Sequence, residues 1–167
     1  MESLKQRTRK KNMVDMWDGL EDAELFERGK YMEPNFIGVV EIKKTLAKET
    51  LKNGMAFIVE MVVLKTNMPD KHPENQRVTW YQGLKDKTVA FPAIAAWAAA
   101  CLGFDPKGDK SKIKEEVQPL LPAAMKEATD NPEDNPFIGV KLELSTFLVK
   151  TKKGGDFTVY DFKPLAA

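Results

Sequence analysis

The sequence contains only one cysteine and one histidine. A disulfide within the chain is therefore impossible, and neither a zinc site nor a histidine-based catalytic triad has a set of side chains to draw on. Cys101 lies in an alanine-rich apolar run, which indicates a buried and unreactive thiol rather than a nucleophile. His72 lies in the polar stretch NMPDKHPENQ, which favours a solvated histidine in a loop. We expect neither a metal nor another cofactor.

A long apolar run and a large net charge are also missing. No run approaches the roughly 20 apolar residues that a membrane-spanning helix needs, and the basic N-terminus lacks the apolar core of a secretory signal. The 26 basic and 25 acidic residues give a net charge of +1, so any attraction to nucleic acid or to a membrane must be local. One domain with extensions is expected from the length of 167 residues, in a reducing cytoplasm.

The start of the chain separates charges of opposite sign. The stretch KQRTRKK carries five basic residues, whereas residues 14–27, VDMWDGLEDAELFE, hold six acidic residues and no basic one. Apolar residues in the acidic stretch recur close to helical spacing, which predicts a short helix or an irregular cap that ends at Gly29. The basic arm is either a solvated tail or a flexible arm that contacts phosphates. We therefore divide the chain into an arm with an acidic segment, residues 1–28, and a domain, residues 29–164.

From Phe36 onward, β-branched and aromatic residues alternate with turn residues. FIGVVEIKKT, LKNGMAFIVEMVVLK and RVTWYQGL predict three strands, with Asn53 and Gly54 in a turn before the second. FPAIAAWAAACLGF predicts a helix with Pro92 in its first turn and Gly103 just past its end. SKIKEEVQPLLPAAMKEATD predicts one or two shorter helices interrupted by Pro119 and Pro122. Two further strands are expected at residues 137–150 and 157–162, joined by TKKGGD.

Two segments about a hundred residues apart open with nearly the same letters, PNFIGVVEIK and NPFIGVKLEL. In a small closed barrel of five antiparallel strands, the first strand pairs with the second and the fourth, so strands one and four meet similar packing demands. Each FIGV is then expected to start a long strand whose glycine permits a bend. The similarity can also arise by chance, and a sandwich would accommodate the helical insert less readily. The predicted fold is mainly β with a helical insert, a five-stranded antiparallel barrel with helices between strands three and four.

Five stretches carry a resemblance to a known family: GKYMEPNFIGVVEI, NGMAFIVEMVVL, VTWYQGL, the alanine-rich helix and NPFIGVKLELSTFLVKTKKGGDFTVYDFKP, which cover roughly residues 29–164. Together they resemble phage-encoded single-stranded DNA-binding proteins built on an OB-fold, so the resemblance implies that the barrel is OB-fold-like. The resemblance implies sequence-independent coating of single-stranded DNA during replication or recombination in the host cytoplasm, with replication or recombination proteins as further partners and no catalysis. Many such proteins end in an acidic tail that recruits partners. This sequence ends at FKPLAA, either because the protein lacks that tail or because the sequence was cut.

A single-strand binder needs cations along the nucleic-acid backbone and aromatic faces on which bases stack. On the fourth strand, inward-facing Ile138, Val140, Leu142 and Leu144 leave Phe147 outward, and Tyr160 on the fifth strand is a second stacking candidate. Trp80 and Tyr81 point to opposite faces of the third strand, so at most one of them stacks, and Tyr81 is preferred. Basic residues in both hairpins are equally compatible with solvated turns. The candidate nucleic-acid-binding residues are Lys43, Lys44, Arg77, Trp80, Tyr81, Lys141, Phe147, Lys150, Lys152, Lys153 and Tyr160.

The second strand is apolar on both faces and is relieved only by Glu60, so both faces need a cover. The N-terminal segment, the helical insert or a second subunit in a homodimer would supply one. This feature favours the alternative function, a non-catalytic interaction module or virion structural module that uses the same barrel for assembly. An enzyme is not expected, because GGD at Gly154 is a hairpin turn and not a phosphate-binding loop. Glu41 and Glu60 could hold magnesium, but carboxylates on strand faces are usually only solvated.

Overall fold

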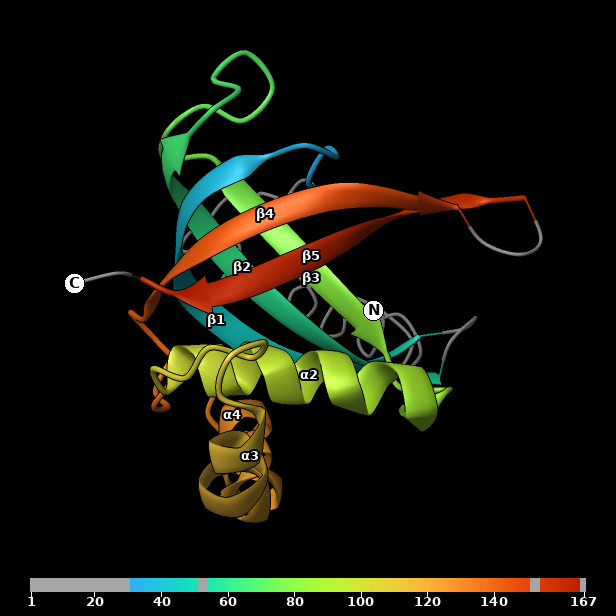
Figure 1. Ribbon diagram of the computed structural model, residues 1–167, viewed down its shortest axis with the longest axis vertical. Helices are drawn as coiled ribbons and strands as arrows, with labels where there is room; N and C mark the ends of the chain where they lie inside the picture. The colour runs from blue at the N-terminus through green and yellow to red at the C-terminus, as the bar shows by residue number, and fades with distance from the viewer. Residues whose placement is uncertain (1–30, 51–53, 151–153, 166–167) are drawn as a thin grey trace, which may run out of the picture.

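The computed structural model describes residues 31–50, 54–150 and 154–165 (Figure 1). The basic arm and acidic segment predicted for residues 1–28 lie outside these ranges, as do Lys152 and Lys153. Across the ranges described, none of the helices is both long enough and apolar enough to pass through a membrane.

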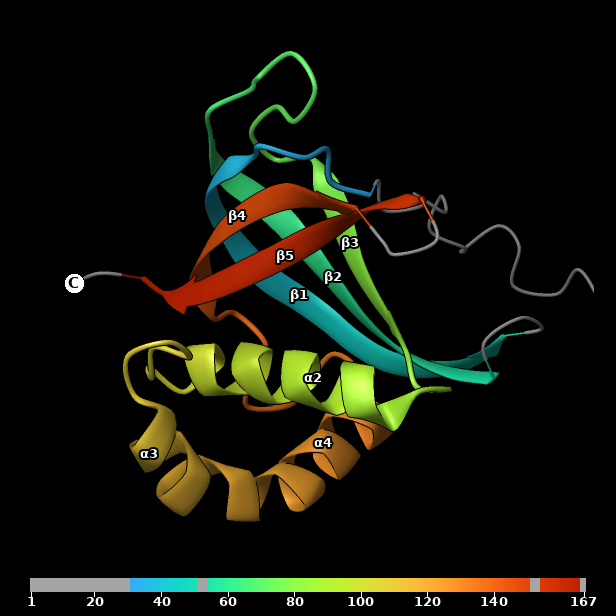
Figure 2. The ribbon, with the colours of Figure 1, turned by 45° about the vertical axis from the view of Figure 1, so that its right-hand side comes forward.

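Five antiparallel strands form one sheet in the order β3-β2-β1-β4-β5. The strands are β1 (Ile37–Thr50), β2 (Gly54–Thr66), β3 (Arg77–Gly83), β4 (Lys141–Lys150) and β5 (Asp156–Pro164). The prediction that strands one and four are neighbours is confirmed, since Gly38 lies opposite Leu144. The sheet is strongly curved, and its two edge strands, β3 and β5, cross near each other (Figures 1 and 2). The predicted closure into a barrel is not confirmed, because among the described residues no ladder joins these two edges.

Helices fill the interval between β3 and β4, as predicted. Helix α2 (Lys87–Cys101) lies across one end of the curved sheet, and Asp86 caps its start by accepting a hydrogen bond from the Thr88 amide at 3.1 Å. Pro92 is therefore inside the helix, and its predicted place in the first turn is wrong because the cap lies further upstream. Gly103, with a φ of 92°, follows the end of the helix as expected.

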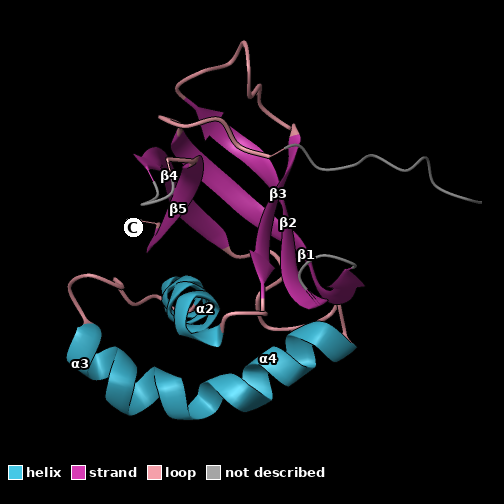
Figure 3. Ribbon diagram, turned by 90° about the vertical axis from the view of Figure 1, so that its right-hand side faces the viewer, coloured by secondary structure: helices cyan, strands magenta, loops and turns pink. Residues whose placement is uncertain are grey.

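A second helical run curves around α2 (Figure 3). It begins as α3 (Lys110–Lys112) and ends as α4 (Leu121–Asp130). A π-helical segment (Ile113–Val117) and a 3-10 turn (Gln118–Leu120) join the two. The prolines predicted to interrupt this run are accommodated by the 3-10 turn and by the first turn of α4, so the backbone stays helical throughout.

Trp97 connects α2 to the sheet and is completely buried. The centroid of its ring lies 4.7 Å from that of Phe137 and 5.3 Å from that of Phe57, which is buried on β2. The inward-facing residues of β2 are buried, whereas Ile58, Val62 and Leu64 on the outer face keep partial exposure. The cover predicted for both faces of β2 is thus complete only on the inner face.

The two FIGV segments adopt different conformations. The first begins β1, but the second forms a turn, and β4 begins only at Lys141. The expectation that both segments start a strand is therefore wrong for the second. The turn still contacts β1, because the Gly139 amide donates to the Ile42 carbonyl at 2.8 Å and the Ile42 amide donates to the Val140 carbonyl at 2.9 Å. A positive φ of 83° at Gly139 breaks the strand conformation.

His72 is completely buried, so the prediction of a solvated loop histidine is wrong. The Glu33 amide donates to its Nε2 at 2.9 Å, which leaves Nδ1 to donate to Gln76 Oε1 at 2.7 Å. Its ring packs edge-on against Phe36. Polar neighbours in the sequence did not indicate burial, because the covering residues come from a segment almost forty positions upstream.

Cys101, the last residue of α2, packs against the core and keeps partial exposure. Burial raises the pKa of its thiol well above the usual value, so the reactive thiolate is scarce at neutral pH. The structure therefore supports the prediction of an unreactive thiol, whereas the predicted burial is only partial.

Candidate nucleic-acid interface

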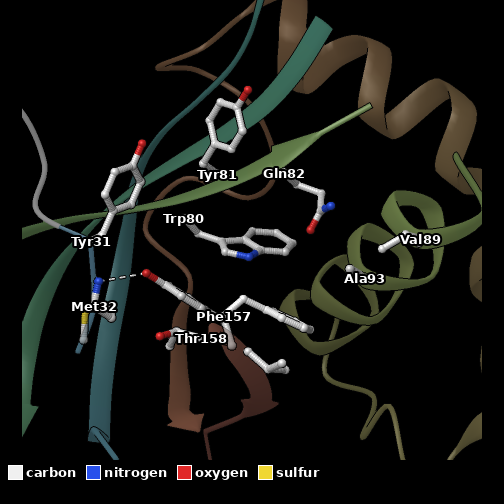
Figure 4. A pocket seen from close by; sticks show the side chains of 11 residues that line it. Tyr31, Met32, Trp80, Tyr81, Gln82, Val89, Ala93, Phe157 and Thr158 are labelled. Carbon is white, nitrogen blue, oxygen red and sulfur yellow. Dashed lines mark hydrogen bonds between the residues drawn. The ribbon is translucent and has the colours of Figure 1, made fainter. Parts of the chain in front are cut away.

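A groove of about 550 Å³ lies where the two sheet edges fail to pair. Its walls come from β3 and β5, with α2 on one side and the segment before β1 at one end (Figure 4). We call it the seam groove. Five aromatic side chains line it, and they come from three separate parts of the chain: Tyr31, Trp80, Tyr81, Phe157 and Tyr160.

The aromatic residues of the seam groove differ in how much of their surface is accessible. Tyr31 and Phe157 are 54% and 49% exposed, and Tyr81 is half-buried. Figure 4 shows the rings of Tyr31 and Tyr81 on the same side of the groove, with their hydroxyls pointing the same way. Trp80 is only 6% exposed and packs edge-on against the core residue Phe162. The predicted opposition of Trp80 and Tyr81 is thus confirmed, with Trp80 on the core side.

Tyr160 lies on the inward face of β5, although the sequence pattern predicted an outward stacking ring. The register of β5 with β4 explains this orientation, because Leu144 pairs with Phe162 and both side chains are buried. Every second residue of β5 then faces inward, and Phe157 takes the accessible face instead. The Tyr160 hydroxyl accepts a hydrogen bond from the Met32 amide at 2.8 Å and donates to the Thr79 carbonyl at 3.4 Å. Burial is the main reason that the pKa of Tyr160 is raised to about 12. The hydrogen bond from the Met32 amide lowers this pKa, and the nearby Tyr31 raises it.

Alkaline pH is expected to destabilise the protein through Tyr160. Its pKa is raised in the folded state to about 12, so the stabilisation is complete below pH about 10 and is lost as the pH rises toward 12. Between pH 8 and pH 11 the wild type should lose about 1 kcal/mol more unfolding free energy than Tyr160→Phe, which cannot ionise. Urea denaturation of both proteins across this range measures the difference. If the unfolding free energies of the two proteins fall in parallel over this pH range, the loss of stability does not come from Tyr160.

The predicted cations of the sheet gather on its outer face. Arg77, Val62, Glu41 and Lys141 form one cross-strand row over β3, β2, β1 and β4. Tyr81 lies on the same face of β3, four residues from Arg77 and therefore about 13 Å along the strand.

Acidic neighbours reduce the charge of this outer face. Lys43 forms an ion pair with Glu41, and Lys44 lies 4.0 Å from Glu133. The outer face of the sheet is therefore less basic than the predicted residues alone suggest.

The β4–β5 hairpin holds the remaining predicted residues. Phe147 is 42% exposed, so its prediction as an outward aromatic is confirmed. Lys150 is exposed at the end of β4, opposite Asp156 and one residue beyond the pairing of Val149 with Phe157. The structure thus places Lys150 beside the seam groove but separates it from Lys141 by the length of β4, about 30 Å.

Four residues at or beside the seam groove were not predicted from the sequence. Tyr31 precedes the first strand, and Phe157 was assigned to the opposite face of β5. Lys85 and Lys87 are exposed and lie in the chain between Gln82 and Val89, which both line the groove. The Lys87 ammonium sits 5.6 Å from the centroid of the Phe91 ring. The position of both lysines directly after β3 is the one signal in the sequence that could have indicated them.

The groove is suited to binding planar rings. Aromatic faces dominate its walls, and no group of three histidine, cysteine or acidic side chains in the described ranges could hold a metal ion. A scan against protein-family models found no match, and a search of curated proteins found no significant match. Function is therefore inferred from the fold and from this groove.

Proposed function

We propose that the protein is a non-catalytic, sequence-independent single-stranded DNA-binding protein that acts in phage replication or recombination. The observation that carries the proposal is the seam groove, where partly accessible rings of Tyr31, Tyr81 and Phe157 surround a space open to solvent. Stacking of a base on an aromatic side chain contributes about 1–3 kcal/mol and tolerates any base. Partners recruited from replication or recombination, and a location in the host cytoplasm, are part of the same proposal.

We further propose that the protein has an OB-fold, a five-stranded barrel that is partly open. The strand order β3-β2-β1-β4-β5 supports it, because closing that order would bring β3 against β5. In this assignment the seam groove is the open part of the barrel. The end of β1 that leads to β2 and the end of β4 that leads to β5 lie on the same side of the sheet (Figure 2). OB-folds commonly hold oligonucleotides with these two connections.

Bases and phosphates would be held by different parts of this surface. Bases stack in the groove, while exposed Lys85, Lys87 and Lys150 at its margins reach the phosphates. Arg77 and Lys141 extend the track over the outer face. Because the net charge is only +1, affinity depends on these local contacts rather than on a general attraction.

Fluorescence anisotropy with labelled oligothymidine tests the proposal. We expect sequence-tolerant binding that is at least about tenfold weaker for a duplex of the same length, since paired bases cannot enter the groove. If about three phosphates are neutralised, the logarithm of the association constant should fall with that of the salt concentration with a slope of about −2. Absence of oligothymidine binding at low salt would overturn the proposal.

The alternative is a non-catalytic interaction or virion structural module. The half-exposed apolar residues on the outer face of β2 and the exposed Leu148 on the β4–β5 hairpin favour it, because such surfaces often contact protein. Light scattering distinguishes the two functions. A large homomeric assembly whose size is unaffected by oligothymidine would select the structural module, whereas a small species that gains mass with the oligonucleotide would select the binding protein.

A further inference from the structure

Residues 31–36, which we call the strap, run from one end of the seam groove to the start of β1. Side chains from three distant parts of the chain hold it. The Met32 amide donates to Tyr160 on β5, and the Glu33 amide donates to His72. On β4, the Thr146 hydroxyl donates to the Glu33 carbonyl at 2.6 Å and accepts from the Phe36 amide at 3.0 Å. The strap is thus fixed largely by side chains.

Tyr160 connects three elements at the seam. Its hydroxyl links the Met32 amide of the strap to the Thr79 carbonyl of β3, while its own backbone belongs to β5. Met32 is 4% exposed and packs in the core directly beside this contact. A single side chain of β5 therefore hydrogen-bonds both the strap and the β3 edge.

The neighbour of Met32 is Tyr31, which forms one wall of the seam groove. Its side chain makes no hydrogen bond to the other described residues, and more than half of its surface is exposed. The position of its ring therefore depends on how firmly the next residue is held. A ring fixed before binding loses less conformational entropy when a base stacks on it.

We propose that Tyr160 is a positioning residue: through its hydrogen bond to the Met32 amide it holds Tyr31 at the wall of the seam groove, ready to stack on a nucleobase. This inference rests on the proposed function. Tyr160 itself needs no contact with the nucleic acid.

The test is a double-mutant cycle of Tyr160→Phe and Tyr31→Ala, with the dissociation constant for oligothymidine measured by anisotropy. Tyr160→Phe removes one hydroxyl and keeps the ring that packs in the core. We expect it to raise the dissociation constant about threefold to tenfold in the wild type, the range of losing one ordered side chain. In the Tyr31→Ala background the same change should have less than about a twofold effect, because the ring being positioned is absent.

Thr45→Val is the matched control for a general loss of stability. The Thr45 hydroxyl also makes two hydrogen bonds, to the Ala128 carbonyl at 2.7 Å and from Asn135 at 3.0 Å, but it lies outside the seam groove. It should leave the dissociation constant unchanged. If the Tyr160→Phe variant melts below the assay temperature, Thr146→Val takes its place in the cycle with Tyr31→Ala. This change removes the hydroxyl that holds Glu33 and Phe36 and so loosens the other end of the strap.

Hydrogen exchange measured by NMR provides a second readout that needs no nucleic acid. In Tyr160→Phe the Met32 amide should exchange about tenfold faster or more, with core amides such as Val59 unchanged. Unchanged Met32 exchange, or an equal loss of affinity in both backgrounds of the cycle, would overturn the positioning role. If the wild type does not bind oligothymidine at all, the proposed function fails instead, and the exchange result still reports on the strap.

Discussion

Replacing Gly38 by alanine is expected to lower the free energy of unfolding by about 3 kcal/mol, the upper end of the range for an overpacked core. An alanine Cβ at this position would lie 2.0 Å from the Lys65 carbonyl oxygen of β2 and 2.6 Å from Cζ of Phe36. The carbonyl belongs to the backbone and cannot rotate away. Relief therefore requires separation of β1 from β2 as well as displacement of Phe36, which is completely buried. Urea denaturation followed by circular dichroism measures the loss.

Gly139, the glycine of the second FIGV segment, is the matched control. An alanine Cβ at this position would meet no described atom within 4 Å, but the φ of Gly139 is +83°. Alanine there should cost only about 1–2 kcal/mol, from backbone strain alone. Asparagine tolerates a positive φ better than alanine, so Gly139→Asn should recover part of that loss. Gly38→Asn should recover nothing, because its Cβ meets the same clash.

A similar cost for alanine at both positions, or a recovery by asparagine at both, would contradict the two different roles. Both glycines lie in the same four-residue sequence, FIGV, so the comparison tests how the surrounding structure changes the role of one residue. Two FIGV segments thus need the same glycine for different physical reasons, one for a close approach of backbones and the other for a left-handed turn.

Much of the sheet could be predicted from local sequence pattern. Alternating apolar residues indicated the strands, and the similarity of the two FIGV segments indicated that strands one and four are neighbours. The conformation of the second segment could not be predicted, because Phe137 packs in the core against Trp97, which lies on a helix forty residues earlier. Packing against a distant element there outweighs a local preference for strand.

The candidate site was predictable only in part, for the same reason. Tyr81 and Phe147 follow from alternation within a single strand, and Lys150 follows from the expected hairpin between the last two strands. The structure places all three on accessible surfaces. The face of β5 depends instead on its register with β4, which a short alternating strand does not determine by itself. Tyr31 enters the groove only because side chains of β4, β5 and a loop hold the strap. Such contacts between distant residues leave no periodic signal in the sequence.

Replacing Phe157 by alanine should weaken binding of oligothymidine by about tenfold or more, since one stacked base contributes about 1–3 kcal/mol. Phe91→Ala is the matched control, because Phe91 is the same residue type with a similar exposure, 53% against 49% for Phe157. It lies on α2 between Val89 and Ala93, which line the groove, but is not itself part of the lining. Anisotropy at low salt, after thermal melting has verified the fold, measures both variants.

The outcome of this pair also decides whether the ligand binds in the seam groove. Stacking inside the groove requires Phe157→Ala to lose affinity while Phe91→Ala stays within about twofold of the wild type. An equal loss in both variants would mean that exposed apolar surface in general, and not the seam groove, attracts the ligand. Phe147→Ala extends the test to the β4–β5 hairpin, where a loss comparable to that of Phe157→Ala would show that the bound strand continues from the groove onto the outer face. If only Phe147→Ala weakens binding, the nucleic acid follows the outer face of the sheet, and the open seam between β3 and β5 needs a different ligand.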